Sequence, residues 1–184
     1  DKTVLFTDVA VEKQPTITNA DSKNNNTVEF ITVGRLDAWR GFDLVIESFA
    51  RLAKEKSNVH LTIVGKGADK ERLQQLAKAL NVSEKITFAG KVSMEEYYRL
   101  LAAADVVVNA SLKEGAVTVS FDSMSMGKPL ICLDTTGYTR YFSNEYAIVI
   151  PRTGRCEVIE NIAAAMLRMT DANERKTIGE KARN

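Results

Sequence analysis

Short apolar runs alternate with longer segments of helical periodicity from residue 28 onward. The short runs are rich in Val, Ile and Phe, and several are apolar at consecutive positions, which is typical of parallel strands covered on both faces. We therefore expect six strands, at residues 28–33, 59–64, 86–89, 105–110, 130–133 and 146–150.

The segments between these runs have apolar residues at intervals of three and four, which predicts amphipathic helices. These helices are expected at 42–53, 72–80, 95–104, 116–126 and 158–169, and a charged helical pattern continues to the last residue. Strands that alternate with helices of this length indicate right-handed crossovers. The predicted fold class is α/β, a Rossmann-like, doubly wound parallel sheet of about six strands.

The 184 residues fit one domain, expected at 28–184, preceded by a segment of different character at 1–27. Residues 21–27 are polar and contain three consecutive asparagines, and residues 4–11 fit a connector or an additional edge strand. The sequence has no initiator Met and stops inside a helical pattern. We interpret 1–27 as a connector from a missing N-terminal domain, and the chain as part of a longer protein.

Composition narrows the range of functions. With 45% hydrophobic and 27% charged residues, the chain is ordinary for a globular protein. Its net charge of +1 gives no reason to expect nucleic acid or an anionic membrane as a partner. No apolar run approaches the roughly 18 residues of a membrane span. Cys132 and Cys156 have neither metal-site spacing nor a disulfide framework, so a reducing, cytoplasmic setting is expected.

The first two predicted strands run into loops that contain glycines and cations. Gly34 and Arg35 follow the first strand, with Arg40 at the start of the next helix, and Gly65 and Lys66 follow the second. Arginine forks and free amides can hold phosphates, and glycine lets the backbone approach a ligand. Each feature also has a simpler interpretation: the arginines could be solvated, and the Gly-x-Gly could be a structural turn, since it lacks the third glycine of a dinucleotide site.

The fourth predicted strand leads into a helix start flanked by two carboxylates, Glu114 and Asp122. Backbone N–H groups at such a start lack partners within the helix and can bind an anion. Gly115 permits close approach, and Gly127 with Pro129 predicts the end of the helix. Carboxylates that hold hydroxyls beside amides that hold an anion suit a sugar nucleotide. Alternatively, one acid favours the helix dipole and the other is solvated.

Two further residues attract attention by their chemistry. His60 is the one histidine of the chain and is expected within a strand, as a packed or paired residue. Cys132 is also expected within a strand, where a thiol is buried and unreactive.

Several motifs occur together in a particular order: Gly34-Arg35-Leu36, a basic residue before Gly41, Ile63-Val64-Gly65-x-Gly67, Glu114-Gly115 with an acid at 122, and Met124-x-x-Gly127-Lys128-Pro129. In this order and spacing, they resemble the retaining glycosyltransferases of family 4 (glycosyl transferases group 1). The resemblance extends from about residue 28 to the C-terminus. It covers the donor-binding, C-terminal half of a GT-B enzyme.

The resemblance implies a role for each matching residue. Arg35 and Arg40 would neutralise the donor diphosphate, Glu114 would hold the transferred sugar, and Asp122 would bind the ribose hydroxyls. The remaining donor contacts would come from Gly34, Gly65 and Lys66, from the backbone near Val92 at the base, and from the amides of Gly115, Ala116, Val117 and Thr118. Neither a metal nor a cofactor is expected, because cationic side chains and the helix dipole stabilise the departing charge.

The resemblance also implies an activity. The family transfers a hexose from a nucleoside diphosphate sugar to a glycan or lipid-linked acceptor, with retention at the anomeric carbon. The acceptor, and any contact with the inner face of the membrane, would come through the missing N-terminal domain. Polysaccharide biosynthesis in the cytoplasm is the usual setting. This chain alone is therefore expected to bind nucleotide without turnover.

Some positions depart from the family pattern and leave alternatives open. Asp122 stands where the family normally has Glu, Ala116 and Val117 replace an aromatic residue and a glycine, and Arg140 occurs where an acid is frequent. The chain could belong to a subfamily with an unusual donor. It could also be a catalytically weakened nucleotide-sugar-binding or partner subunit. A third alternative, a dehydrogenase-type dinucleotide domain, is disfavoured by the missing third glycine.

Overall fold

The computed structural model describes residues 26–113, 118–135, 139, 142 and 145–183. Six strands form one parallel sheet in the order β3-β2-β1-β4-β5-β6. They are β1 (Val28–Val33), β2 (Val59–Val64), β3 (Ile86–Gly90), β4 (Val106–Asn109), β5 (Leu130–Leu133) and β6 (Ala147–Ile150). The strand order changes direction between β1 and β4, so the sheet is doubly wound. The predicted fold class is confirmed, and the connector predicted at 1–27 lies almost wholly outside the described residues.

The helices are α1 (Phe42–Glu55), α2 (Lys70–Ala79), α3 (Met94–Ala103), α4 (Thr118–Ser125), α5 (Arg155–Arg168) and α6 (Ala172–Arg183), with short 3₁₀ turns η1 (Ala38–Arg40) and η2 (Ser83–Lys85). Helices α2 and α5 begin earlier than their apolar stripes predict, because their first turns are polar. The first two residues predicted for α4 lie outside the described residues. Within the described ranges, no helix is both long and apolar enough to cross a membrane.

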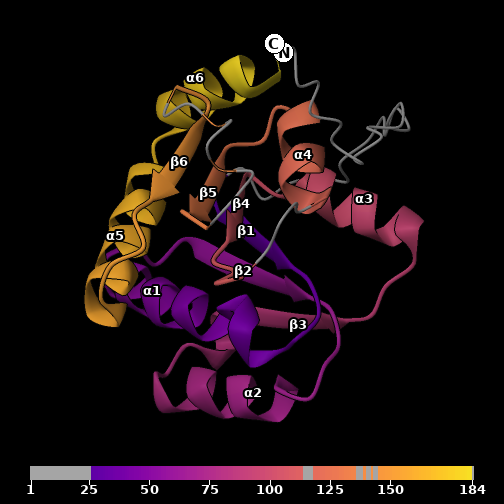
Figure 1. Ribbon diagram of the computed structural model, residues 1–184, viewed down its shortest axis with the longest axis vertical. Coiled ribbons are helices and arrows are strands. Elements are labelled where there is room, and N and C mark those ends of the chain that lie inside the picture. The colour runs from indigo at the N-terminus through magenta and orange to yellow at the C-terminus, as the bar shows by residue number, and fades with distance from the viewer. Residues whose placement is uncertain (1–25, 114–117, 136–138, 140–141, 143–144, 184) are drawn as a thin grey trace, which may run out of the picture.

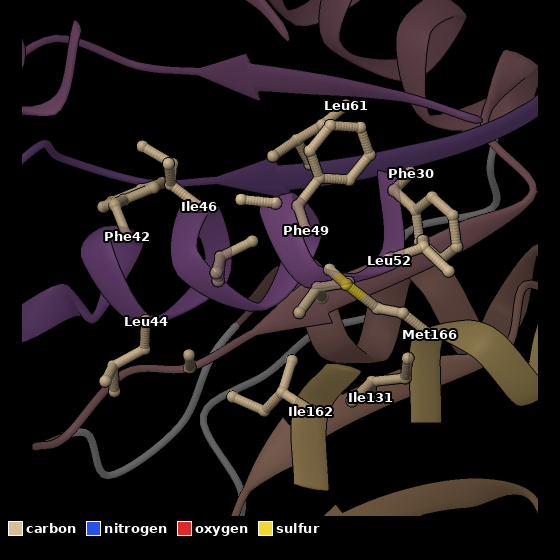
Figure 2. Close-up of a cluster of buried hydrophobic side chains, with 14 of the residues drawn as sticks. Phe30, Phe42, Leu44, Ile46, Phe49, Leu52, Leu61, Ile131, Ile162 and Met166 are labelled. Carbon is tan, nitrogen blue, oxygen red and sulfur yellow. The ribbon is translucent and has the colours of Figure 1, made fainter. Parts of the chain in front are cut away.

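One face of the sheet is covered by α1, α2 and α5, with α1 packed against both of the other helices. Figure 1 shows α1 and α5 side by side on this face. The cluster brings Phe49 of α1 edge-on to Phe30 of β1, with ring centroids 6.4 Å apart, and includes Ile131 of β5 and Met166 of α5. Figure 2 shows these side chains meeting between the elements. This cluster holds the sheet rigid beneath the loops at its carboxyl edge.

Helices α3 and α4 cover the opposite face, where a second cluster joins Leu101 of α3 and Val119 of α4 to Ile31, Val107 and Leu130 of the strands. Figure 1 shows α3 and α4 together, across the sheet from α1 and α5. In a parallel α/β sheet the helices begin at the carboxyl ends of the strands. The start of α3 and the described start of α4 therefore lie at the same edge of the sheet.

The C-terminal ends of α3 and α4 are tied together. Gly127, with φ of 65°, donates to the Met124 carbonyl, and Lys128 N donates to the Ser123 carbonyl, which together form a Schellman cap. The Lys128 ammonium Nζ then donates to the carbonyl oxygens of Ala102 at 2.6 Å and Ala104 at 2.8 Å. These are carbonyls at the end of α3, where a cation also favours the helix dipole. The cap of α4 thus fixes this helix against α3.

Candidate functional site

The loops after β1 and β2 interlock through backbone contacts. Gly34 N donates to the Val64 carbonyl at 3.0 Å, and Gly65 N donates to the Gly90 carbonyl at 2.8 Å. A Cβ added at Gly65 would lie 1.8 Å from the Gly34 oxygen, and one at Gly67 would lie 2.3 Å from the Leu36 oxygen. The Gly-x-Gly turn is therefore required sterically, whether or not a ligand is bound. Gly65 also faces a cavity.

This cavity, of about 510 Å³, lies beyond the carboxyl ends of β1 and β2 and is bounded on one side by α3 and α4. It brings together eight of the residues that the sequence proposed: Gly34, Arg35, Arg40, Gly65, Lys66, Val92, Thr118 and Asp122. The crevice where a doubly wound sheet changes direction is the usual ligand position in such folds. These eight residues therefore line one cavity, and their roles in binding stay predictions.

The other four predicted site residues, Glu114, Gly115, Ala116 and Val117, lie outside the described residues, as does Arg140. Their predicted roles stay predictions. Thr118 and Val119 at the described start of α4 line the cavity.

Four cationic side chains are among the described lining of the cavity: Arg35, Arg40, Lys66 and Lys91. Arg35 is well exposed, at 76%, and its Nε lies 3.2 Å from the Asp37 carboxylate. Such an exposed ion pair is worth little, so Arg35 can turn toward an anion at small cost. Together these cations make the described wall strongly positive.

Arg40 is held in a different way from Arg35. Its guanidinium carbon lies 4.4 Å from the centroid of the Trp39 ring, a cation–π contact that fixes the plane of the fork. Burial lowers the pKa of Arg40, the nearby Asp37 raises it and Arg35 lowers it further. The residue remains a cation at neutral pH, because the ordinary arginine pKa is so high. The cavity thus combines an exposed arginine, Arg35, with a positioned one, Arg40.

Asp122 is buried in the cavity wall, with 4% of its surface exposed, rather than solvated. The phenolic O–H of Tyr97 on α3 donates to its Oδ2 at 2.7 Å, across the gap between α3 and α4. Burial raises the pKa of Tyr97, and the hydrogen bond to Asp122 raises it further, so the phenol keeps its proton. A carboxylate and a phenol therefore form one polar unit beside the cations.

Sequence reasoning missed three polar or flexible lining residues, Lys91, Met94 and Tyr97. Tyr97 falls on the apolar stripe of the helix predicted at 95–104, which indicates packing, and its ring does pack partly against the second core cluster. For Lys91 the sequence did contain a usable signal, because this residue directly precedes Val92, which the resemblance places at the site. Met94 is the most exposed large apolar residue in the described chain, at 64%, and lies at the cavity mouth.

The other candidate residues have structural partners. His60 is paired, as predicted: Nδ1 lies 2.9 Å from Glu29 Oε2 and Nε2 lies 3.1 Å from Thr87 Oγ1. Cys132 is buried in β5, and burial raises the pKa of its thiol to about 12. Among the described residues, no group of three or more His, Cys, Asp or Glu side chains could hold a metal ion.

Comparison with known sequences gives a family match over most of the chain. The family model described as glycosyl transferases group 1 matches residues 13–184. An uncharacterized glycosyltransferase of Methanocaldococcus jannaschii is 27% identical over 98% of this chain and 47% of its own length. The chain therefore spans about half the length of this relative.

Solved structures share the fold. The pneumococcal O-GlcNAc transferase GtfA, crystallised with UDP and GlcNAc, matches 86% of this chain and 32% of its own, with a TM-score of 0.78 at 18% identity. The C-terminal domain of a glycosyl transferase group 1 family protein from Francisella tularensis matches 85% of this chain and 82% of its own, with a TM-score of 0.73 at 18% identity. At these identities the likeness concerns the fold.

Proposed function

The chain belongs to the glycosyl transferases group 1 family, and we propose that its carboxyl-edge cavity binds the nucleoside diphosphate sugar donor of a glycosyl transfer reaction. The observation that carries this proposal is the composition of one cavity wall. Four cations, the described start of α4 and a buried carboxylate all face the same space. A diphosphate with a sugar at each end needs cations for the phosphates and acceptors for the hydroxyls.

Arg35 and Arg40 are the residues proposed to hold the diphosphate. Arg40 is already oriented by Trp39, and Arg35 is exposed enough to close over the anion. When the glycosidic bond to the leaving phosphate breaks, negative charge grows on the nucleoside diphosphate. Positioned guanidinium groups stabilise this negative charge most strongly where water is excluded. In a transferase that uses no metal ion, we expect Arg35 and Arg40 to provide this stabilisation.

The finer features of the reaction rest on the resemblance in sequence motifs. We propose that the transfer retains the anomeric configuration, that the sugar is a hexose, and that Glu114 holds its hydroxyls. The acceptor, a glycan or lipid-linked glycan, would bind to a part of the protein outside this chain. The relative's greater length supports this division, because this chain corresponds to about half of it, 47%.

A second candidate function is that of a nucleotide-sugar-binding subunit with weakened catalysis. Asp122 favours it, since an aspartate is one methylene shorter than the glutamate usual there and one of its oxygens already binds Tyr97. Restoring the family residues in Asp122→Glu and Val117→Gly distinguishes the two. A large gain in nucleotide affinity indicates a decayed site, whereas a loss indicates a working variant.

Isothermal titration calorimetry of the chain with UDP, GDP and ADP tests the proposed function. We expect micromolar to millimolar binding of at least one nucleotide, with UDP tried first because the pneumococcal neighbour was crystallised with it. Arg35→Ala should weaken binding about tenfold or more, since hydrogen bonds to charged groups are worth about 1.5–3 kcal/mol.

The matched control is Arg51→Ala, an exposed arginine of α1 that pairs with Glu160 away from the cavity. This variant should bind nucleotide as the wild type does. Absence of binding by all three nucleotides at millimolar concentration, or equal losses in Arg35→Ala and Arg51→Ala, contradicts the proposal.

A further inference from the structure

We propose that Tyr97 is a positioning residue that fixes Asp122, so that the two form one hydrogen-bond-accepting unit for the hydroxyl groups of the donor. This inference rests on the proposed function and goes beyond it, because it assigns a role to a residue outside the sequence motifs.

The geometry that supports it is a contact between facing helices. Tyr97 lies in the first half of α3 and Asp122 lies in α4, and the distance from the phenol oxygen to Oδ2 is 2.7 Å. Both residues line the cavity. The two helices cannot slide independently, because Lys128 joins the cap of α4 to the carbonyls of Ala102 and Ala104. The contact is therefore part of a fixed frame.

A short hydrogen bond to a charged oxygen restricts the carboxylate more than packing alone would. Asp122 is buried, so loss of this bond would remove a hydrogen-bond donor from a carboxylate that has little contact with solvent. Because an aspartate side chain is shorter than that of a glutamate, Asp122 reaches a ligand hydroxyl only if its carboxylate is correctly oriented. Tyr97 fixes this orientation from the facing helix.

Counting donors and acceptors shows what this unit can bind. The O–H group of Tyr97 donates its single proton to Asp122, so the phenol oxygen offers other groups only its lone pairs, which are acceptors. A carboxylate likewise has only acceptors. Burial and the bond to Asp122 raise the pKa of Tyr97, so this arrangement persists at neutral pH. The unit therefore accepts hydrogen bonds from hydroxyls and disfavours phosphate oxygens, which carry no proton to donate.

The rest of the described wall has the opposite preference. Arg35, Arg40, Lys66 and Lys91 are donors and cations, which attract phosphates. A cavity with a cationic part and an accepting part orients a ligand that has phosphates at one position and a vicinal diol at another. The ribose of a nucleoside diphosphate carries such a diol.

The experiment compares Tyr97→Phe with the wild type in calorimetric titrations of UDP, 2′-deoxy-UDP and 3′-deoxy-UDP. Loss of the Tyr97 hydroxyl should raise the Kd for UDP about threefold to tenfold, because it removes the hydrogen bond that orients a charged acceptor. For the deoxynucleotide that lacks the partner hydroxyl, the change should be less than about twofold, since the interaction is already missing. Tyr98→Phe is the matched control, because Tyr98 lies next along α3 but does not line the cavity.

A double-variant cycle separates positioning from general packing. In an Asp122→Ala background, Tyr97→Phe should have no further effect on the Kd for UDP, because Tyr97 acts through the carboxylate. Circular dichroism should show Tyr97→Phe folded, since the ring is retained.

Three results overturn the inference. The first is an unchanged Kd for UDP in Tyr97→Phe, and the second is an equal loss for UDP and both deoxynucleotides, which indicates a packing role. The third is an additive cycle with Asp122→Ala. If the wild-type chain binds no nucleoside diphosphate, the proposed function itself fails. If the wild type binds UDP and one of these three results is obtained, only the inference about Tyr97 fails.

Discussion

Cys132 and Cys156 place the same side chain in opposite surroundings. Cys132 lies in the centre of β5 and is 1% exposed, and burial raises the pKa of its thiol to about 12. Cys156 is exposed in the first turn of α5. Since the thiolate is the reactive form, the two thiols should differ greatly in rate.

We expect an aromatic disulfide reagent at pH 8 to modify Cys156 rapidly and Cys132 only after denaturation. Burial raises the pKa of the Cys132 thiol in the folded state, so the stabilisation linked to its proton is complete below the unfolded-state pKa near 9. This stabilisation is lost as the pH rises from about 9 toward 12. The measurement is absorbance of the released thiolate with and without denaturant. Cys156→Ser should abolish the rapid phase, and a rapid phase that persists in this variant contradicts the prediction.

Most of the residues that sequence could place in the site follow strand ends or lie in the helix that comes next. Gly34, Arg35 and Lys66 follow apolar strands directly, and a parallel sheet brings such positions to one edge. Tyr97 could not be assigned in this way, because its hydroxyl partner Asp122 belongs to another helix 25 residues away. A spacing of three and four residues shows which face of α3 packs, but it does not identify a polar atom at the far end of a packed ring.

Among the elements, the loops after β1 and β2 depend most strictly on glycine. Gly65 has φ of 144°, which side chains rarely adopt, and a Cβ there would lie 1.8 Å from the Gly34 oxygen. The obstacle is backbone, so no side-chain rotation can relieve it. Both loops line the cavity, which makes their contact a structural requirement of the site.

Gly65→Ala should therefore lower the free energy of unfolding by at least about 3 kcal/mol, from overpacking together with an unfavourable φ. Gly154→Ala is the matched control, because Gly154 has φ of −64° and an added Cβ there meets nothing within 4 Å. At this N-cap position the cost should stay below about 1 kcal/mol. Urea denaturation followed by circular dichroism measures both, and equal losses would refute the steric argument.

The sequence predicted strands better than helix starts. The bounds of β1, β2 and β5 agree with the apolar runs, because strands covered on both faces need consecutive apolar residues. The helices α2 and α5 begin two to three residues before their apolar stripes. Arg72 pairs with Asp69 at the start of α2, and Arg155 pairs with Asp43 at the start of α5. Polar contacts of this kind leave no periodic signal.

For the molecule as a whole, the small net charge does not reveal how the basic residues are distributed. The chain has 25 basic and 24 acidic residues, a net charge of +1, yet four basic side chains share the described wall of one cavity. Outside the cavity, cations such as Arg51, Arg72 and Arg99 are paired with nearby acids. A ligand with several negative charges therefore meets a concentration of positive charge at the described wall of the cavity, although Arg35 there is paired with Asp37.

The dependence of nucleotide affinity on salt should reflect this uneven distribution. We expect the Kd for UDP to rise about threefold to tenfold between about 50 and about 500 mM NaCl, because added ions screen the cavity charges. Lys91→Ala should weaken binding and flatten the plot of log Kd against log salt, since one cavity cation is removed. Lys78→Ala, which removes the same charge from the exposed end of α2, should leave that slope unchanged. A slope that is the same in the wild type and both variants would mean that total charge, not the cavity, governs the binding.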